Sequence, residues 1–271
     1  MLKFLLFARN KNTIYDIDDA EYLRFPKEII DHYIKHSHYV ITGGTVLEDY
    51  CRKLNKNIFI STSPVTEHSF SKTQRNTKPV IGWVGDYGNG NEIEKEYSHK
   101  SSLNSILFPA IAQLKFELKL VLIGVKEKED IPEIKKYFQS YPHVELDIPE
   151  NLSWEDDRWL YKKICEFDLG VSPILDFEFN RAKSAFKAKQ YLSCGIPTIA
   201  SNVGENSTFV NTSNGFICDS VNDYVSAITS ITNYSKEDYQ KLSDNAYNCK
   251  GSFSMQLYCE KLIGMCKTMN Q

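Results

Sequence analysis

The sequence predicts an α/β fold built on parallel sheets, and two observations carry this prediction. Short apolar segments of strand length alternate with amphipathic segments of helical length along nearly the whole chain of 271 residues. A polar, Ser/Thr-rich stretch at residues 61–79, with a proline near each end, interrupts the alternation. We therefore expect two α/β units joined by a linker.

The unit before the linker is expected to hold three strands. Each candidate strand is an apolar run too short for a helix, and each is separated from the next by a segment with helical period. The expected strands are Thr13–Ile17, Tyr39–Thr42 and Asn57–Ile60, and the expected helices are Leu2–Arg9, Lys27–Lys35 and Thr45–Leu54.

The unit after the linker is expected to be a doubly wound domain, in which ligands bind where strands end and helices begin. Its expected strands are Val80–Val84, Lys119–Ile123, His143–Leu146, Leu169–Val171 and Thr198–Ala200. Its expected helices are Ser101–Leu114, Ile131–Phe138, Glu155–Glu166, Ser184–Leu192 and Val221–Ile231, and two more fall between Lys236 and Cys266. The domain boundaries that follow are 1–70, 71–235 and 236–271, with the last helices packing back toward the N-terminal domain.

Composition excludes several classes of function. The net charge of −3 gives no electrostatic case for nucleic-acid binding. Seven scattered cysteines without a C-x-x-C pair indicate reduced thiols in a cytoplasmic protein. No apolar run is long enough to span a bilayer. The sequence HYIKHSH holds His32, His36 and His38 at a helix end without metal-ligand spacing, so no metal is expected.

The segment 179–206 begins with a concentration of positive charge. Ser184 is expected to cap a helix, with Lys183 just before it and Lys187 one turn in on the same side, whereas Lys189 is expected to point away. Positive charge at a helix N-terminus is unfavourable unless an anion binds there. The pattern therefore predicts a phosphate site, and the alternative is a solvated basic face.

The same region resembles the glycosyl transferases group 1, the retaining GT-B glycosyltransferases of family four. Four motifs follow the basic helix in the order and spacing of that family: Gly195-Ile196-Pro197, Ile199-Ala200-Ser201, Val203-Gly204 and Asn214-Gly215-Phe216. With YDIDDAEY and VITGGTVLEDY in the first unit, the resemblance reaches nearly the whole chain. It implies a GT-B-like fold with one complete Rossmann-like C-terminal domain and a partial Rossmann-like N-terminal domain.

The resemblance implies that the substrate is a nucleotide-diphosphate sugar and that no cofactor or metal is required. Lys183 and Lys187 are the candidate catalytic groups, because positive side chains and helix N–H groups stabilise a diphosphate leaving group. The loop of VIGWVGDYGNG and Lys100 match the part of the family that contacts the diphosphate. The candidate donor-binding residues are Gly85, Asp86, Lys100, Arg181, Ser184, Ala185, Phe186 and Gln190.

The chain departs from the family at two places. Ala182 and Gln190 occupy positions where many members carry a pair of glutamates, so the Asp176–Arg181 loop is the nearest candidate for contact with the donor sugar. The N-terminal domain is expected to begin about a hundred residues late for a complete domain. We therefore expect this chain alone to bind donor but to transfer sugar poorly or not at all.

The resemblance also suggests what lies on the acceptor side. Family members commonly build surface polysaccharide or glycolipid, so the expected acceptor is a saccharide or a lipid-linked molecule. Peripheral contact with the inner face of the membrane belongs to this expectation. A non-catalytic or decayed donor-binding remnant is the alternative.

The YDIDDAEY sequence allows a further alternative, a haloacid-dehalogenase-like phosphatase. Asp16 would attack phosphate and Asp18 would act as acid and base. That interpretation lacks an acidic residue at Gly90 and leaves the region 183–216 unexplained. In the glycosyltransferase interpretation, Asp16, Asp18 and Asp19 lie at the cleft between the domains. The structural alternative is that they lie at a strand end and cap the next helix.

Overall fold

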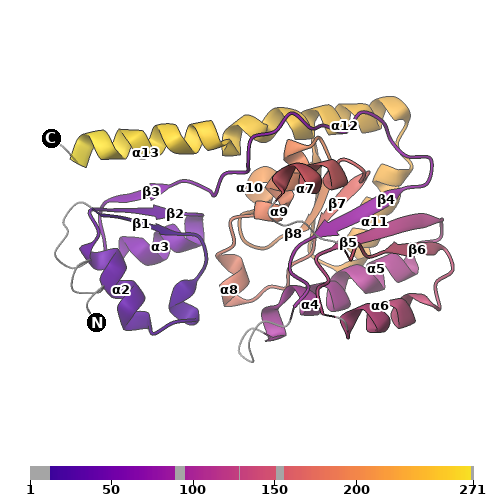
Figure 1. The fold of residues 1–271 in the computed structure, drawn as a ribbon, viewed down its shortest axis with the longest axis horizontal. Coiled ribbons are helices and arrows are strands. Elements are labelled where there is room, and N and C mark those ends of the chain that lie inside the picture. Colours follow the sequence, from indigo (N-terminus) through magenta and orange to yellow (C-terminus); the bar gives the residue numbers. More distant parts are fainter. Residues whose placement is uncertain (1–12, 89–94, 128, 151–155, 270–271) are drawn as a thin grey trace.

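The computed structural model describes residues 13–88, 95–127, 129–150 and 156–269. The predicted helix Leu2–Arg9 and the residue Gly90 lie outside the described residues. Figure 1 shows a smaller N-terminal unit and a larger C-terminal unit, with the C-terminal helices running along both.

The C-terminal unit holds a six-stranded sheet in which every strand pair is parallel, in the order β6-β5-β4-β7-β8-β9. This is the strand order of the Rossmann fold, 3-2-1-4-5-6. The strands are β4 Val80–Val84, β5 Leu118–Ile123, β6 Val144–Asp147, β7 Leu169–Ser172, β8 Thr198–Ser201 and β9 Gly215–Cys218. The prediction of a doubly wound domain is confirmed, with five of the six strands near their predicted bounds.

The sixth strand, β9, was missed because it is short and begins with glycine, a weak strand former. The structure explains the glycine. A Cβ atom at Gly215 would lie 1.8 Å from the Thr198 carbonyl oxygen, so only glycine lets β9 reach β8.

Helices cover both faces of this sheet (Figure 1). They are α4 His99–Ser102, α5 Phe108–Gln113, α6 Asp130–Phe138, α7 Asp157–Ile164, α8 Glu178–Arg181, α9 Phe186–Ser193, α10 Asn206–Phe209 and α11 Val221–Thr232. Leu107, Ile134 and Ile228 pack into one core with the strands, and Leu160 and Tyr191 pack into another. The helices α4 and α5 are joined by a π-helical turn, Leu103–Leu107, just before Pro109, which has no N–H to donate.

The N-terminal unit holds a parallel sheet of three strands in the order β1-β2-β3 among the described residues. Its elements are β1 Ile14–Ile17, a 3-10 turn Glu21–Leu23, α2 Lys27–His36, β2 Tyr39–Thr42, α3 Thr45–Arg52 and β3 Ile58–Ile60. The predicted strands and helices of this unit within the described residues are confirmed to within two residues. Its core also takes in Phe179 and Ala182 from the C-terminal unit, so the two units share a hydrophobic contact.

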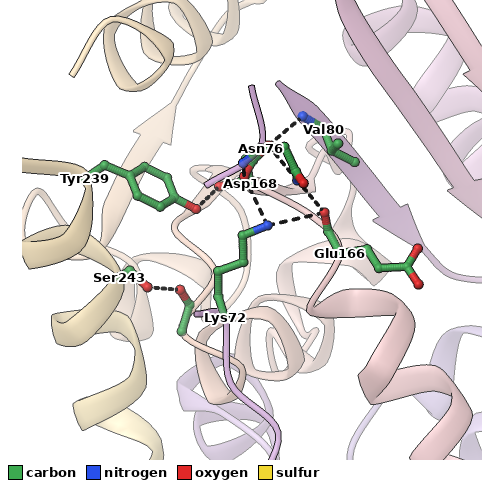
Figure 2. Close-up of polar contacts among 8 residues, drawn as sticks. Lys72, Asn76, Val80, Glu166, Asp168, Tyr239 and Ser243 are labelled. Carbon is green, nitrogen blue, oxygen red and sulfur yellow. Dashed lines mark hydrogen bonds and ion pairs between the residues drawn. The ribbon is translucent and has the colours of Figure 1, made fainter. Parts of the chain in front are cut away.

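The linker has no regular secondary structure, as predicted, but it is firmly packed. The Lys72 ammonium lies 3.0 Å from Asp168 Oδ1, and the two side chains are 5% and 2% exposed. Asp168 also accepts hydrogen bonds from the backbone N–H groups of Asn76 and Val80, as Figure 2 shows. Because this ion pair is buried and fully hydrogen-bonded, the linker is anchored to the C-terminal unit rather than free.

Two helices close the chain and cross from one unit to the other. The first, α12 Lys236–Asn248, packs on the C-terminal unit, where the Tyr239 hydroxyl donates to the Asp168 carbonyl (Figure 2). After a 3-10 turn at Cys249–Phe253, α13 Met255–Met269 lies against the N-terminal unit. There Lys261 Nζ donates to the Ile60 carbonyl, and Tyr258 donates to Asp16. No helix in the described part of the chain has the length and apolar character needed to cross a membrane.

Candidate functional site

The strand order places a crevice between β4 and β7, because the chain turns in opposite directions after these two neighbouring strands. In open α/β sheets, ligands bind at such a switch point, beyond the carboxyl ends of the strands. Gly85 follows β4, and the segment 173–185 leads from β7 to α9. The predicted lysines therefore lie at the place where the fold favours a ligand.

The turn into α9 differs from the prediction. The helix begins at Phe186, and Ser184 does not cap it; the Ser184 hydroxyl instead lies 3.3 Å from Asp18 Oδ2 in the N-terminal unit. Ala185 precedes the helix with a φ of 60°, a left-handed conformation that costs a residue with a Cβ about 1 kcal/mol. In the described part of the chain no side chain caps this helix N-terminus, so its first N–H groups are available to an anion.

The loop after β8 supports this turn. Gly204 has a φ of 61°, and a Cβ atom there would lie 2.6 Å from the Lys183 carbonyl oxygen. The Glu205 N–H donates to that same carbonyl at 3.0 Å. The Val203-Gly204 motif is thus explained by the close packing of this loop on the lysine turn.

Lys187 occupies the centre of the crevice. Its ammonium lies 2.8 Å from His99 Nε2, and a Cβ atom on Gly85 would lie 2.7 Å from its Cε. Burial, with the nearby charge of Lys183, lowers the pKa of Lys187 to about 7. Burial and the two lysines hold the pKa of His99 well below its usual value, so the imidazole is neutral and accepts the hydrogen bond. Near neutral pH, Lys187 is buried and partly protonated, and it forms no ion pair with any carboxylate of the described residues.

Lys183 lies beside Lys187 on the N-terminal side of the crevice. Its ammonium is 3.5 Å from Asp19 Oδ1 and 4.8 Å from the centre of the Phe179 ring. The two lysines that the sequence singled out are thus brought together, and the lowered pKa of Lys187 records their proximity.

Three neighbouring cavities surround the two lysines. A cavity of about 390 Å³ lies between Gly85, Leu160 and Gln190. A second, of about 230 Å³, lies between Ser172 and the turn 183–187, and a third, of about 240 Å³, reaches Arg24 and Asn180. Lys187 lines the first and second cavities and Lys183 lines the second and third, so the three follow one another around the lysines.

The other predicted donor-binding residues divide into two groups. Ser184, Ala185, Phe186, Gln190, Gly85 and Asp86 line these cavities. Two cations do not line them: Lys100 is ion-paired with Asp130 of α6, and Arg181 lies 2.6 Å from Asp176 on the surface. The sequence predicted that Lys100, at this helix start, faces the crevice. In the structure its neighbour His99 does so instead.

Lys189 lines none of these three cavities, but it is no solvated lysine. It is fully buried, and its ammonium donates to the Ser63 carbonyl at 2.5 Å and to the Thr62 hydroxyl. Burial lowers its pKa to about 8, while Asp18 and Glu205 act in the opposite direction. Lys189 therefore fixes the start of the linker to α9. It points away from the three cavities, as predicted, and toward the linker.

The three aspartates that the sequence predicted for the interdomain cleft are separated in the structure. Asp18 and Asp19 line the second cavity, opposite Lys183 and Lys187. Asp16 is directed to α13, where it accepts a hydrogen bond from Tyr258, and burial raises its pKa. Among the described residues, no group of three or more His, Cys, Asp or Glu side chains is arranged to hold a metal ion.

Two further residues, His99 and Asn180, line the third cavity. Sequence reasoning did not identify His99, for which a histidine beside a lysine at a predicted helix start was the available signal. Asn180 belongs to the Asp176–Arg181 segment that the sequence proposed for contact with the donor sugar, but no local pattern singled out this residue within it.

Comparison with solved structures identifies the class of fold. The chain superimposes on sucrose-phosphate synthase from Thermosynechococcus elongatus with a TM-score of 0.76 and 14% identity, covering 99% of this chain and 70% of that one. Anabaena HepE, solved with UDP and glucose, gives a TM-score of 0.67 at 11% identity, covering 96% and 72%. A glycosyltransferase from Rickettsia africae gives 0.63 at 13% identity, covering 95% and 69%. No protein-family model and no curated protein sequence matches.

These neighbours are glycosyltransferases, and the likeness confirms the predicted GT-B-like α/β fold. It agrees with the resemblance to glycosyl transferases group 1 that the motifs after the basic helix suggested. At these identities the likeness establishes the fold, and the activity has to be argued from the site.

Proposed function

We propose that the chain is a glycosyltransferase that moves a sugar from a nucleotide-diphosphate-sugar donor to an acceptor hydroxyl. The observation that carries the proposal is the position of Lys187, buried beside Lys183 at the uncapped N-terminus of α9. Two cations and free N–H groups at a Rossmann switch point match a diphosphate in both charge and hydrogen bonding. Without such a ligand the arrangement is electrostatically unfavourable.

The chemistry follows from this charge arrangement. In the reaction the acceptor hydroxyl oxygen bonds to the sugar C1 and releases its proton to solvent, while the bond between C1 and the diphosphate oxygen breaks and its electron pair leaves with the diphosphate. The negative charge that develops lies near Lys187, which has a pKa of about 7 in the free chain and becomes fully protonated beside an anion. Such groups stabilise the leaving diphosphate more in the transition state than in the bound donor, which lowers the barrier.

The first cavity is the proposed nucleoside site. Its volume of about 390 Å³ lies in the range of small-molecule pockets, and its walls combine the apolar Val84 and Leu160 with the amide of Gln190. Lys187 at its inner end would place the diphosphate between this cavity and the second one. Anabaena HepE has been solved with UDP and with UDP-glucose, which supports a uridine diphosphate donor as the first to test.

The acceptor is proposed to be a saccharide or a lipid-linked molecule used in surface polysaccharide or glycoconjugate synthesis. This part rests on the sequence resemblance. With such an acceptor, we further propose that the protein works in the cytoplasm, in peripheral contact with the inner face of the membrane.

Release of nucleoside diphosphate tests the proposed function. The chain is incubated with UDP-glucose, UDP-galactose, UDP-N-acetylglucosamine and GDP-mannose, each with and without a mixture of saccharide and lipid-linked acceptors. In contrast to the expectation from the sequence that this chain alone transfers sugar poorly or not at all, the proposal predicts acceptor-dependent release of UDP or GDP, which Lys187→Ala abolishes. Binding of nucleoside diphosphate without release in any mixture would favour a donor-binding protein that does not catalyse transfer.

A further inference from the structure

Asn180 lies on α8, between the two units, with its side-chain orientation fixed by the backbone around it. Its Nδ2 group donates to the Tyr97 carbonyl at 3.1 Å and to the Leu175 carbonyl at 2.9 Å. An amide nitrogen has two hydrogens, and both are used here. The reversed orientation would place Oδ1 against two carbonyl oxygens, so the hydrogen bonds determine where the oxygen lies.

The Oδ1 atom of Asn180 has no hydrogen-bond partner among the described residues. The residue is fully buried and forms part of the wall of the 240 Å³ cavity. A buried acceptor without a donor costs about 1–3 kcal/mol, so a donor from a ligand or from a water molecule is expected to satisfy it.

The chemistry of this oxygen restricts what can satisfy it. An amide oxygen only accepts hydrogen bonds, and so do the oxygens of an ionised phosphate or carboxylate. The diphosphate therefore cannot be the partner, and the ligand has to bring a donor such as a hydroxyl.

The charges of this cavity are balanced. Arg24 and Lys183 line it together with Asp19 and Asp86, and Lys183 is already 3.5 Å from Asp19. The second cavity has the same balance, with Asp18 and Asp19 beside Lys183 and Lys187, so charge does not separate the two cavities. The amide oxygen of Asn180 does, because it needs a ligand that donates a hydrogen bond.

The position of the cavity identifies the part of the donor that occupies it. Lys183 lines both this cavity and the one beside the α9 N-terminus, where the diphosphate is proposed to bind. The group attached to the diphosphate on the side away from the nucleoside is the sugar.

From these observations we propose that Asn180 Oδ1 accepts a hydrogen bond from a hydroxyl of the transferred sugar and is a specificity-determining residue. This inference rests on the proposed function. Oδ1 has almost no exposed surface in the free chain, so the proposal requires the cavity wall to shift when the sugar binds. The substrate is then a sugar with a free hydroxyl at the position facing Asn180, and sugars that lack this hydroxyl bind more weakly.

The test compares matched donors on the wild-type chain and on an Asn180→Ala variant. Calorimetry first measures UDP and GDP, then the four nucleotide sugars named above, and then the monodeoxy analogues of the sugar that binds tightest. We expect one deoxy position to weaken binding to the wild type by about twofold to tenfold, as expected for one neutral hydrogen bond. The same analogue should bind Asn180→Ala as well as its parent sugar does, while UDP or GDP affinity is unchanged.

A second asparagine provides the control. Asn245→Ala removes an amide that donates to the Ser213 carbonyl at 2.9 Å, far from the site, and it should retain the full deoxy-sugar effect. If Asn180→Ala does not fold, the wild-type analogue series still decides: equal affinity for every deoxy analogue overturns the inference. Failure of both UDP and GDP to bind the wild type overturns the proposed function instead, so the two failures are distinguishable.

Discussion

Glu205 of the C-terminal unit caps a helix of the N-terminal unit. Its Oε1 atom lies 2.7 Å from the backbone nitrogen of Thr45 and 2.8 Å from the Thr45 hydroxyl, at the start of α3. Thr208 holds the other carboxylate oxygen at 2.7 Å, so the carboxylate is fixed from its own unit and binds the other. A Cβ atom on Gly44 would lie 2.6 Å from Glu205, which explains the glycine before α3.

Removing this contact should loosen the two units. For Glu205→Ala we expect the free energy of unfolding to fall by about 1–2 kcal/mol, the usual cost of losing a helix cap. Hydrogen exchange should become faster at the first turn of α3 while β4 and β5 stay protected. Glu117→Ala, at an exposed position of the same unit, should change neither measurement. Uniformly faster exchange across both units would show that Glu205 supports the fold as a whole rather than the contact between units.

The buried linker pair should matter far more than a surface pair. Lys72→Met leaves Asp168 buried without its cation, which typically costs about 3–5 kcal/mol. Lys78→Met removes a partner from the exposed pair with Glu145 and should cost at most about 1 kcal/mol. Urea unfolding of the two variants measures the difference. Equal losses would mean that the packing of the linker does not depend on this ion pair.

Lys187 should make the stability of the ligand-free chain depend on pH. Its pKa is about 7 in the folded chain and about 10.4 in an unfolded one. Between these values the unfolded chain binds the proton and the folded chain does not, so stability rises with pH from about 7 to 10. Lys189, with a pKa of about 8, adds to the rise above pH 8.

Thermal unfolding at pH 6.5, 7.5 and 8.5 measures this dependence. Lys187→Met should be most stabilised relative to wild type at pH 6.5. Between pH 6.5 and 8.5 the variant should gain less stability than the wild type does. A variant with the same pH dependence as the wild type would contradict the burial of a charged Lys187.

The loop after β4 should tolerate no side chain at Gly85. A Cβ atom there would lie 2.6 Å from Trp83 Cζ2 and 2.7 Å from Lys187 Cε. Because Trp83 is held in the core, the lysine has to move, and we expect Gly85→Ala to weaken UDP binding by about tenfold or more, the loss of a charge-assisted contact. Gly251→Ala, where a Cβ meets no atom within 4 Å, is the matched control. Unchanged UDP affinity in Gly85→Ala would place the ligand elsewhere.

The sequence predicted the elements better than it predicted the contacts between them. The period of the apolar residues identified β4, β5 and the basic helix, because local burial patterns determine them. The capping role of Ser184 was wrong, since a left-handed Ala185 shortens the helix and frees the Ser184 hydroxyl for Asp18. The partner of Lys100 and the burial of Lys189 depend on residues distant in the sequence, which no local pattern records.

The number of protons taken up when UDP binds tests the central claim most directly. A group with a pKa of about 7 is about one-tenth protonated at pH 8, and a bound diphosphate restores its full charge. Calorimetry at pH 8 in buffers of different ionisation enthalpy should therefore show uptake of about 0.9 proton per UDP in the wild type. Lys187→Ala should take up almost none and bind about 1–3 kcal/mol more weakly. UDP binding with no proton uptake by the wild type, or with equal uptake by Lys187→Ala, would contradict a diphosphate site at Lys187.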